Sequence, residues 1–204
     1  MTITNLRAFA KVLVEKLGRP VTQAEYDNAF LGEVREVREK EMSIFTATFS
    51  AVAVSAAQDV FELVAASPNK VSLREVRIGQ YSDFGDAAAE MLSVQIVVGH
   101  TTSGSGGSTV TGNNLRNWDT NAAPADTTTV EANNTTIASS GTGLVLIADS
   151  FNIASGWWYR PPEDERIMID GAGSATARLV VRVTAPADAI TTNGTIVYEE
   201  NPSR

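Results

Sequence analysis

The sequence predicts a mainly β fold, an antiparallel β-sandwich of jelly-roll kind that follows an N-terminal helical arm. Three observations predict it. Apolar residues recur at helical spacing up to residue 42, the period changes to two from residue 43, and short β-branched segments then alternate with turn residues. No helical period separates these segments, which favours an antiparallel sandwich over a sheet of alternating strands and helices. The expected domains are an arm at 1–42 and a β-sandwich domain at 43–204.

The arm is expected to hold two amphipathic helices. Thr4 is placed to cap the first, and Gly18 with Pro20 ends it. Thr22 and Glu25 form a capping box at the start of the second. Short helices such as these are stabilised mainly by burial of their apolar stripes, either on the β domain or on a partner. The arm residues that we expect to bind a partner are Leu6, Phe9, Leu13, Tyr26 and Phe30.

Eight or nine strands are expected after the arm, because segments rich in β-branched residues recur with turns between them. The segments are 43–55, 59–65, 70–79, 89–99, 143–153, 156–160, 165–170, 177–184 and 194–200. Turns are expected at 67–70, 82–86, 160–165, 170–175 and 191–194, where Pro, Gly or Asn stands at a position of fixed or positive φ.

The segment 99–143 interrupts this rhythm. It is rich in Thr, Ser, Asn, Gly and Ala, and it is far longer than the roughly four to six residues of an ordinary connection. We expect an excursion that leaves the sandwich and returns, with one or two edge strands in "TTVEANNTTIAS" (128–139). Its function is expected to be contact with other groups and not catalysis.

Composition excludes several classes of protein. The chain has no cysteine, so it has no disulfide and no thiolate ligand for zinc. A signal peptide and a membrane span are not expected, because Met1 is followed by polar residues and no long window is apolar. The net charge is −8 and no lysine follows Lys70, which disfavours direct nucleic-acid binding by the β domain.

No catalytic residue is expected. The stretch "GHTTSGSGGSTVTGNN" (99–114) holds His100, the single histidine of the chain, but none of its serines has glycines at both positions that a nucleophile elbow requires. The stretch also lacks the helical continuation of a dinucleotide-binding loop and the lysine of a phosphate loop. An enzyme that pairs His100 with Asp83 or Asp86 is the alternative.

No metal and no cofactor is expected. Two acidic groups are candidates for calcium ligands, one formed by Asp83, Asp86 and Glu90 and the other by residues 163–165. Neither matches the spacing of a calcium loop, so solvated turns are the better interpretation.

Trp157, Trp158 and Tyr159 form the densest aromatic cluster. In a strand, Trp157 and Tyr159 point to one face and Trp158 to the other, so one face is expected in the core. We expect partner contact by Trp157 and Trp158 at a subunit interface. Stacking of an exposed ring on a sugar is the alternative.

Residues 46–201 resemble a group of β-rich structural proteins of tailed-phage virions. The motifs that carry the resemblance are "GHTTSGSGG" (99–107), "VEANNTT" (130–136), and an element made by Trp157, Tyr159, Arg160, Pro161, Glu163 and Arg166. The arm lies outside the resemblance. The resemblance implies a capsid decoration, or cement, protein on the outer surface of the capsid, which binds the major capsid protein and forms a homo-oligomer, a trimer being favoured.

The expected function is therefore that of a non-enzymatic virion protein that joins neighbouring capsomers. A rigid β body, apolar edges and an arm or loop that reaches a neighbour are what such a protein requires. Two alternatives belong to other classes: another virion part, such as a head-tail adaptor or tail-fibre module, and a carbohydrate-binding jelly-roll module that uses Trp157 or Trp158.

Overall fold

The computed structural model describes residues 44–80, 91–115, 127–152, 154–172, 177–185 and 190–201. The chain divides into two compact units, Met1–Glu41 and Met42–Arg204, and every described residue belongs to the second. The helical arm expected at 1–42 and its residues Leu6, Phe9, Leu13, Tyr26 and Phe30 lie outside the described residues. Asp83, Asp86 and Glu90 lie outside them as well.

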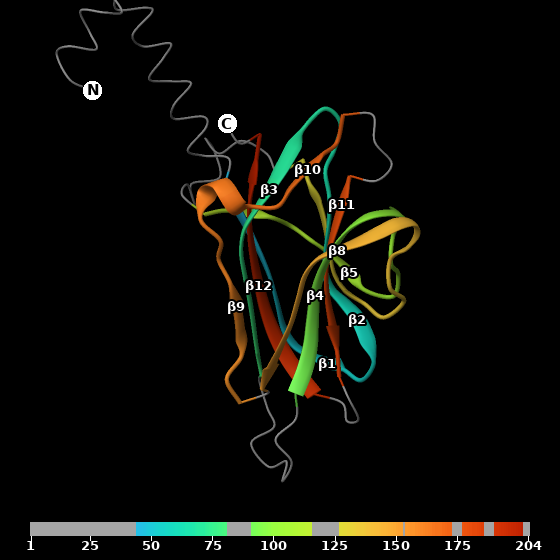
Figure 1. Cartoon of the computed structure of the whole chain (residues 1–204), viewed down its shortest axis with the longest axis vertical. Helices are drawn as coiled ribbons and strands as arrows, with labels where there is room; N and C mark the ends of the chain where they lie inside the picture. The colour runs from blue at the N-terminus through green and yellow to red at the C-terminus, as the bar shows by residue number, and fades with distance from the viewer. Residues whose placement is uncertain are drawn as a thin grey trace, which may run out of the picture. The chain divides into compact units, whose positions relative to one another are not determined.

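The second unit is mainly β, as the sequence predicts, and its strands form two antiparallel sheets (Figure 1). Sheet A has the order β10 (Met168–Asp170), β3 (Lys70–Gln80), β12 (Ile190–Glu200), β1 (Ile44–Val54) and β6 (Asn113–Asn114). β9 (Trp157–Tyr159) also pairs with β3, and a 3₁₀ turn (Glu163–Glu165) lies between β9 and β10. Sheet B has the order β5 (Ser108–Val110), β7 (Thr129–Asn134), β2 (Ala57–Val64), β11 (Arg178–Thr184), β4 (Met91–Thr102) and β8 (Ser139–Asn152).

The core consists of apolar side chains that alternate along the strands. Phe45 and Tyr198 stack with ring centroids 5.7 Å apart, and both are almost fully buried. The ring centroids of Phe49 and Phe61 lie 5.1 Å apart, and this contact connects β1 of sheet A with β2 of sheet B. The period of two therefore follows from the division of each strand between a core face and an outer face.

All nine segments expected to be strands contain one, namely β1, β2, β3, β4, β8, β9, β10, β11 and β12. The segment 99–143 is more regular than the sequence predicts, because β4 extends into it to Thr102 and β8 begins in it at Ser139. β7 is not an edge strand, since it pairs with β2 on one side and β5 on the other.

The turn expected at 191–194 is wrong, because these residues lie inside β12. Asn193 accepts hydrogen bonds from the hydroxyl of Ser50 (3.0 Å) and the amide of Ala51 (2.8 Å), at a bulge where Ala51 has a φ of 56°. Gly194 lies against the ring of Phe61, which a Cβ would approach to 2.9 Å. Asn193 and Gly194 therefore contact β1 and β2, and the chain does not turn at these residues.

Candidate functional site

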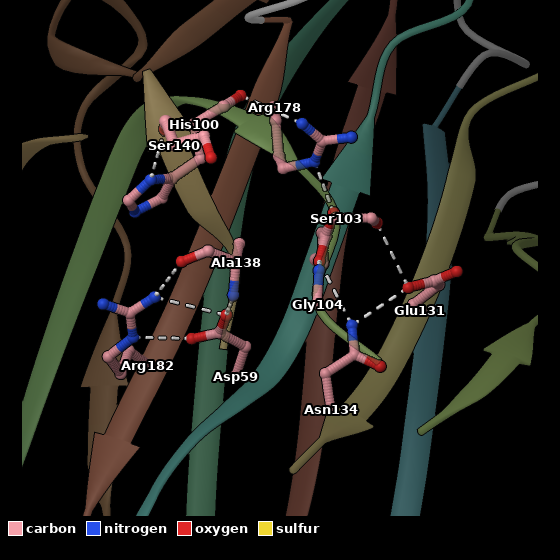
Figure 2. Close-up of polar contacts among 11 residues, drawn as sticks. Asp59, His100, Ser103, Gly104, Glu131, Asn134, Ala138, Ser140, Arg178 and Arg182 are labelled. Carbon is pink, nitrogen blue, oxygen red and sulfur yellow. Dashed lines mark hydrogen bonds and ion pairs between the residues drawn. The ribbon is translucent and has the colours of Figure 1, made fainter. Parts of the chain in front are cut away.

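Residues 99–107, which include the end of β4, lie against the face of sheet B opposite to the core. Arg178 and Arg182 of β11 are on that face, since they alternate with the core residues Leu179, Val181 and Val183. Residues 99–107, which are rich in glycine, serine and threonine, approach these arginines and their acidic partners (Figure 2).

Two buried ion pairs connect β2 with β11 on this face. Arg178 donates to Glu62, and Arg182 donates to Asp59 with an Nε–Oδ1 distance of 2.7 Å. Both carboxylates are 0% exposed. A buried carboxylate needs a partner to offset the loss of hydration, and each guanidinium supplies one. Because each acid is enclosed and neutralised, this arrangement holds strands together and offers no open group to a substrate.

A bulge places the two acids on the same face. Asp59 and Glu62 are three residues apart, so strict alternation would put them on opposite faces of β2. The pairing with β11 shifts register between Val181 and Arg182, which leaves Val60 as an extra residue. Asp59 therefore faces Arg182 on the side where Glu62 faces Arg178.

Glu62 also holds the stretch that follows β4. Its carboxylate accepts from the hydroxyl of Ser103 (2.5 Å), the amide of Gly104 (2.9 Å) and the side-chain amide of Asn134 (3.1 Å). Asn134 belongs to β7 and accepts from the amide of Gly107 at 3.2 Å. One buried acid thus joins β2, β7, β11 and the "SGSGG" stretch, which makes the stretch part of the structure of sheet B.

Gly104 is expected to tolerate no side chain. A Cβ at this position would lie 2.7 Å from the carbonyl oxygen of Thr136 and 2.8 Å from the side chain of Asn134. We expect Gly104→Ala to lower the free energy of unfolding by about 1–3 kcal/mol, because the backbone must shift away from Glu62. Chemical denaturation measures the effect. Gly79→Ala is the control, since no atom lies within 4 Å of a Cβ there, and an equal loss in both variants would contradict this reason.

His100 packs between the ends of β4 and β8. Its Nδ1 lies 3.2 Å from the carbonyl oxygen of Ser140, and a Cβ at Gly143 would lie 2.6 Å from its ring. Its backbone carbonyl accepts from Arg178 at 2.9 Å. The contacts of His100 that the structure describes are therefore with backbone, Gly143 and Arg178, while the acids Asp83 and Asp86 of the enzyme alternative lie outside the described residues.

β8 is an edge strand that exposes apolar side chains. It pairs with β4 on one side and ends the order of sheet B. Leu144, Val145 and Leu146 are 56%, 45% and 42% exposed. Residues 139–148 contain neither a charged side chain nor a proline, the devices with which edge strands usually avoid pairing with other chains. We call residues 139–148 the open edge.

The aromatic cluster divides between two faces, as predicted. Trp157 is 8% exposed and stacks on Tyr159 with centroids 5.9 Å apart, whereas Trp158 is 63% exposed. Trp157 is thus in the core, and the side chain that a partner can reach is Trp158. Its Nε1 donates to Glu75 of β3 at 3.1 Å. Partner contact by Trp157 and Trp158 stays a prediction.

Trp157 also lowers the pKa of Asp149, a residue on β8. The indole Nε1 donates to Asp149 at 3.1 Å, and with the Ser150 amide this holds the pKa of Asp149 below its ordinary value. The bonds therefore stabilise the fold above the ordinary pKa, and their contribution is lost as the pH falls through the lowered one. We expect Asp149→Asn to lower Tm at pH 7 and the difference from the unmodified chain to shrink at pH values below about 4. Thermal unfolding across pH measures this, and a difference constant with pH would contradict it.

Of the two candidate calcium groups, residues 163–165 lie within the described part of the chain, where they form an exposed 3₁₀ turn. Within the described residues, no group of three or more His, Asp or Glu side chains is placed to hold a metal ion. A search of the same residues for a helix with the length and apolarity to cross a membrane finds none.

No protein-family model matches this chain, and no curated protein matches its sequence. Among solved structures, the chain is similar to one chain of a structure of Maize Chlorotic Mottle Virus revealed by single-particle analysis. The two are 14% identical, and the match covers 78% of this chain and 95% of that chain with a TM-score of 0.24. A TM-score of this size supports no conclusion about function.

Proposed function

We propose that this chain is a non-enzymatic structural protein of a phage virion, a decoration or cement protein on the outer surface of the capsid. In this role it forms a homo-oligomer and binds the major capsid protein, so that it joins neighbouring capsomers. The observation that carries the proposal is the open edge of β8, because an uncharged apolar edge strand is suited to association with another chain.

The strand pairings support a jelly roll. When β5, β6 and β7 are set aside and β9 and β10 are counted as one interrupted strand, the first strand pairs with the last and the second with the second to last. The pairs are β1 with β12, β2 with β11, β3 with β9 and β10, and β4 with β8. A long hairpin rolled into two sheets has these pairings, and the jelly roll is an architecture of viral capsid and lectin domains.

A jelly-roll fold alone does not distinguish a role in a capsid from the binding of carbohydrate. The resemblance of residues 46–201 to phage virion proteins favours assembly, and the open edge supplies a surface for it. Self-association through two copies of the same edge gives a dimer, while a trimer requires the open edge to meet a different surface of the next copy. The arm at 1–42 is the second part that we assign to contact with a neighbour.

Solution mass and binding to shells test this proposal. Light scattering of the full chain is expected to give an oligomer, and a trimer has three times the 21.7 kDa of one chain. Co-sedimentation with assembled shells of the matching major capsid protein is expected to bring the oligomer into the pellet. A monomer that does not sediment with shells would contradict both parts. Cryo-electron microscopy of the particle separates a capsid location from a head-tail adaptor or tail-fibre location.

A further inference from the structure

A hollow of about 390 Å³ lies on the face of sheet A opposite to the core. β1, β3 and β12 form its floor, and the segment between β9 and β10 forms its rim. Four arginines and one glutamate line it: Arg74, Arg77, Arg160, Arg166 and Glu75. We call it the arginine hollow. A cluster of four arginines is unexpected in a chain of net charge −8.

Glu75 is shared by two of these arginines. Arg77 donates to it, and the Nε of Arg160 lies 3.9 Å from its Oε2. The side chains of Arg77 and Arg160 are 61% and 66% exposed, whereas that of Glu75 is 9% exposed. Both arginines face Glu75 through Nε, so these contacts do not use the terminal nitrogens of the two largely exposed side chains.

Glu199 is shared by the other two. Its Oε2 lies 2.7 Å from Nη1 of Arg74 and 3.7 Å from Nη1 of Arg166, and its side chain is 12% exposed. Glu163, which is 81% exposed, lies 4.0 Å from Arg166. Within the described residues, four guanidinium groups therefore contact two enclosed carboxylates and one exposed carboxylate. The guanidinium groups of Arg77 and Arg160 are both largely exposed, which favours an anion as the ligand.

Trp158 of β9 lies beside the arginine hollow, next to its lining residues Arg77 and Glu75. It lies opposite Arg77 in the pairing of β9 with β3, so both side chains are on the outer face of sheet A. Its Nε1 donates to Glu75, which fixes the indole next to the arginines while 63% of the residue stays exposed. An exposed indole face beside guanidinium groups offers an apolar platform and an anion site to a single ligand.

We propose that the arginine hollow binds an acidic sugar. The sugar carboxylate is received by the terminal nitrogens of Arg77 and Arg160, whose planar geometry matches a carboxylate. The apolar face of the sugar ring packs on Trp158. Inorganic phosphate has no ring for Trp158, and an acidic peptide has no rigid apolar face of this kind. The proposal does not rest on a virion role.

Isothermal titration calorimetry of the full chain with trigalacturonate tests the proposal. We expect binding that is about tenfold or more tighter than that of the neutral galactose trisaccharide, because the neutral sugar lacks the charged hydrogen bonds. Arg77→Gln and Arg160→Gln are each expected to weaken the binding about tenfold. Trp158→Ala is expected to weaken it by a factor of roughly 2–10, and Trp158→Phe to restore part of the loss.

The control is Lys70→Gln, which removes an exposed positive charge at the start of β3, outside the arginine hollow, and should leave the affinity unchanged. Circular dichroism of each variant excludes unfolding as the cause of a loss. Absence of binding to trigalacturonate, or equal binding of the neutral trisaccharide, would overturn the proposal. So would binding of hexaglutamate or inorganic phosphate that matches trigalacturonate and is unaffected by Trp158→Ala.

Discussion

Glu62→Gln is expected to lower the free energy of unfolding by about 3–5 kcal/mol, because it leaves the guanidinium of Arg178 enclosed without its counter-charge. Glu62 is 0% exposed and Arg178 only 10% exposed, so water has little access to compensate. The same substitution weakens the acceptor for Ser103 and Gly104, which also loosens the stretch after β4. Urea denaturation measures the change.

A matched control separates burial from charge. Lys70 and Asp170 lie 3.3 Å apart, but their side chains are 52% and 47% exposed. Lys70→Met is expected to cost about 1 kcal/mol or less, as is usual for exposed pairs. The double variant Glu62→Gln with Arg178→Met is expected to be more stable than Glu62→Gln alone, because no buried charge remains unpaired and the amide oxygen can still accept from Gly104. Equal effects of Glu62→Gln and Lys70→Met would show that the buried pair has no special role.

The strands were predictable from sequence because side chains along each strand alternate between a core face and an outer face, which gives apolar residues a period of two. In β11, Leu179, Val181 and Val183 face the core, and the residues between them do not. The same reasoning correctly separated Trp157 from Trp158. Local alternation carries this information since a core face and an outer face are properties of a single strand.

Contacts between strands were not predictable in this way. The period of two puts Asp59 and Glu62 on opposite faces, and only the bulge at Val60 brings them together. Asn193 and Gly194 have the composition of a turn, but their contacts with β1 and β2 keep them within a strand. In both cases a partner distant in sequence decides the local conformation.

The arginine hollow shows the same limit. Its cations come from β3 and from the segment after β9, which are far apart in the chain and meet because β9 and β10 pair along one edge of β3. The alternation of residues along the strand places Trp158 on an outer face. The net charge shows an acidic chain, and neither observation points to four arginines in one hollow.

Introducing lysine into the open edge is expected to abolish self-association. Leu144→Lys and Leu146→Lys each place a charge on the edge where the proposed contact forms, and burial of that unpaired charge opposes the contact whether the open edge meets its own copy or a different surface. Both residues are largely exposed in one chain, so each substitution is expected to change the stability of the monomer by about 0.5 kcal/mol or less. Light scattering is expected to report one chain mass for both variants.

Thr48→Lys is the control, because it adds the same charge at an exposed position of β1, in the other sheet. It is expected to keep the oligomer of the unmodified chain. An oligomer that survives both edge variants would mean that the chains associate elsewhere, and the open edge would then not carry the proposed function. Loss of the oligomer together with loss of co-sedimentation would mean that binding to the shell requires the assembled form, because a single weak contact per chain becomes effective when several act together.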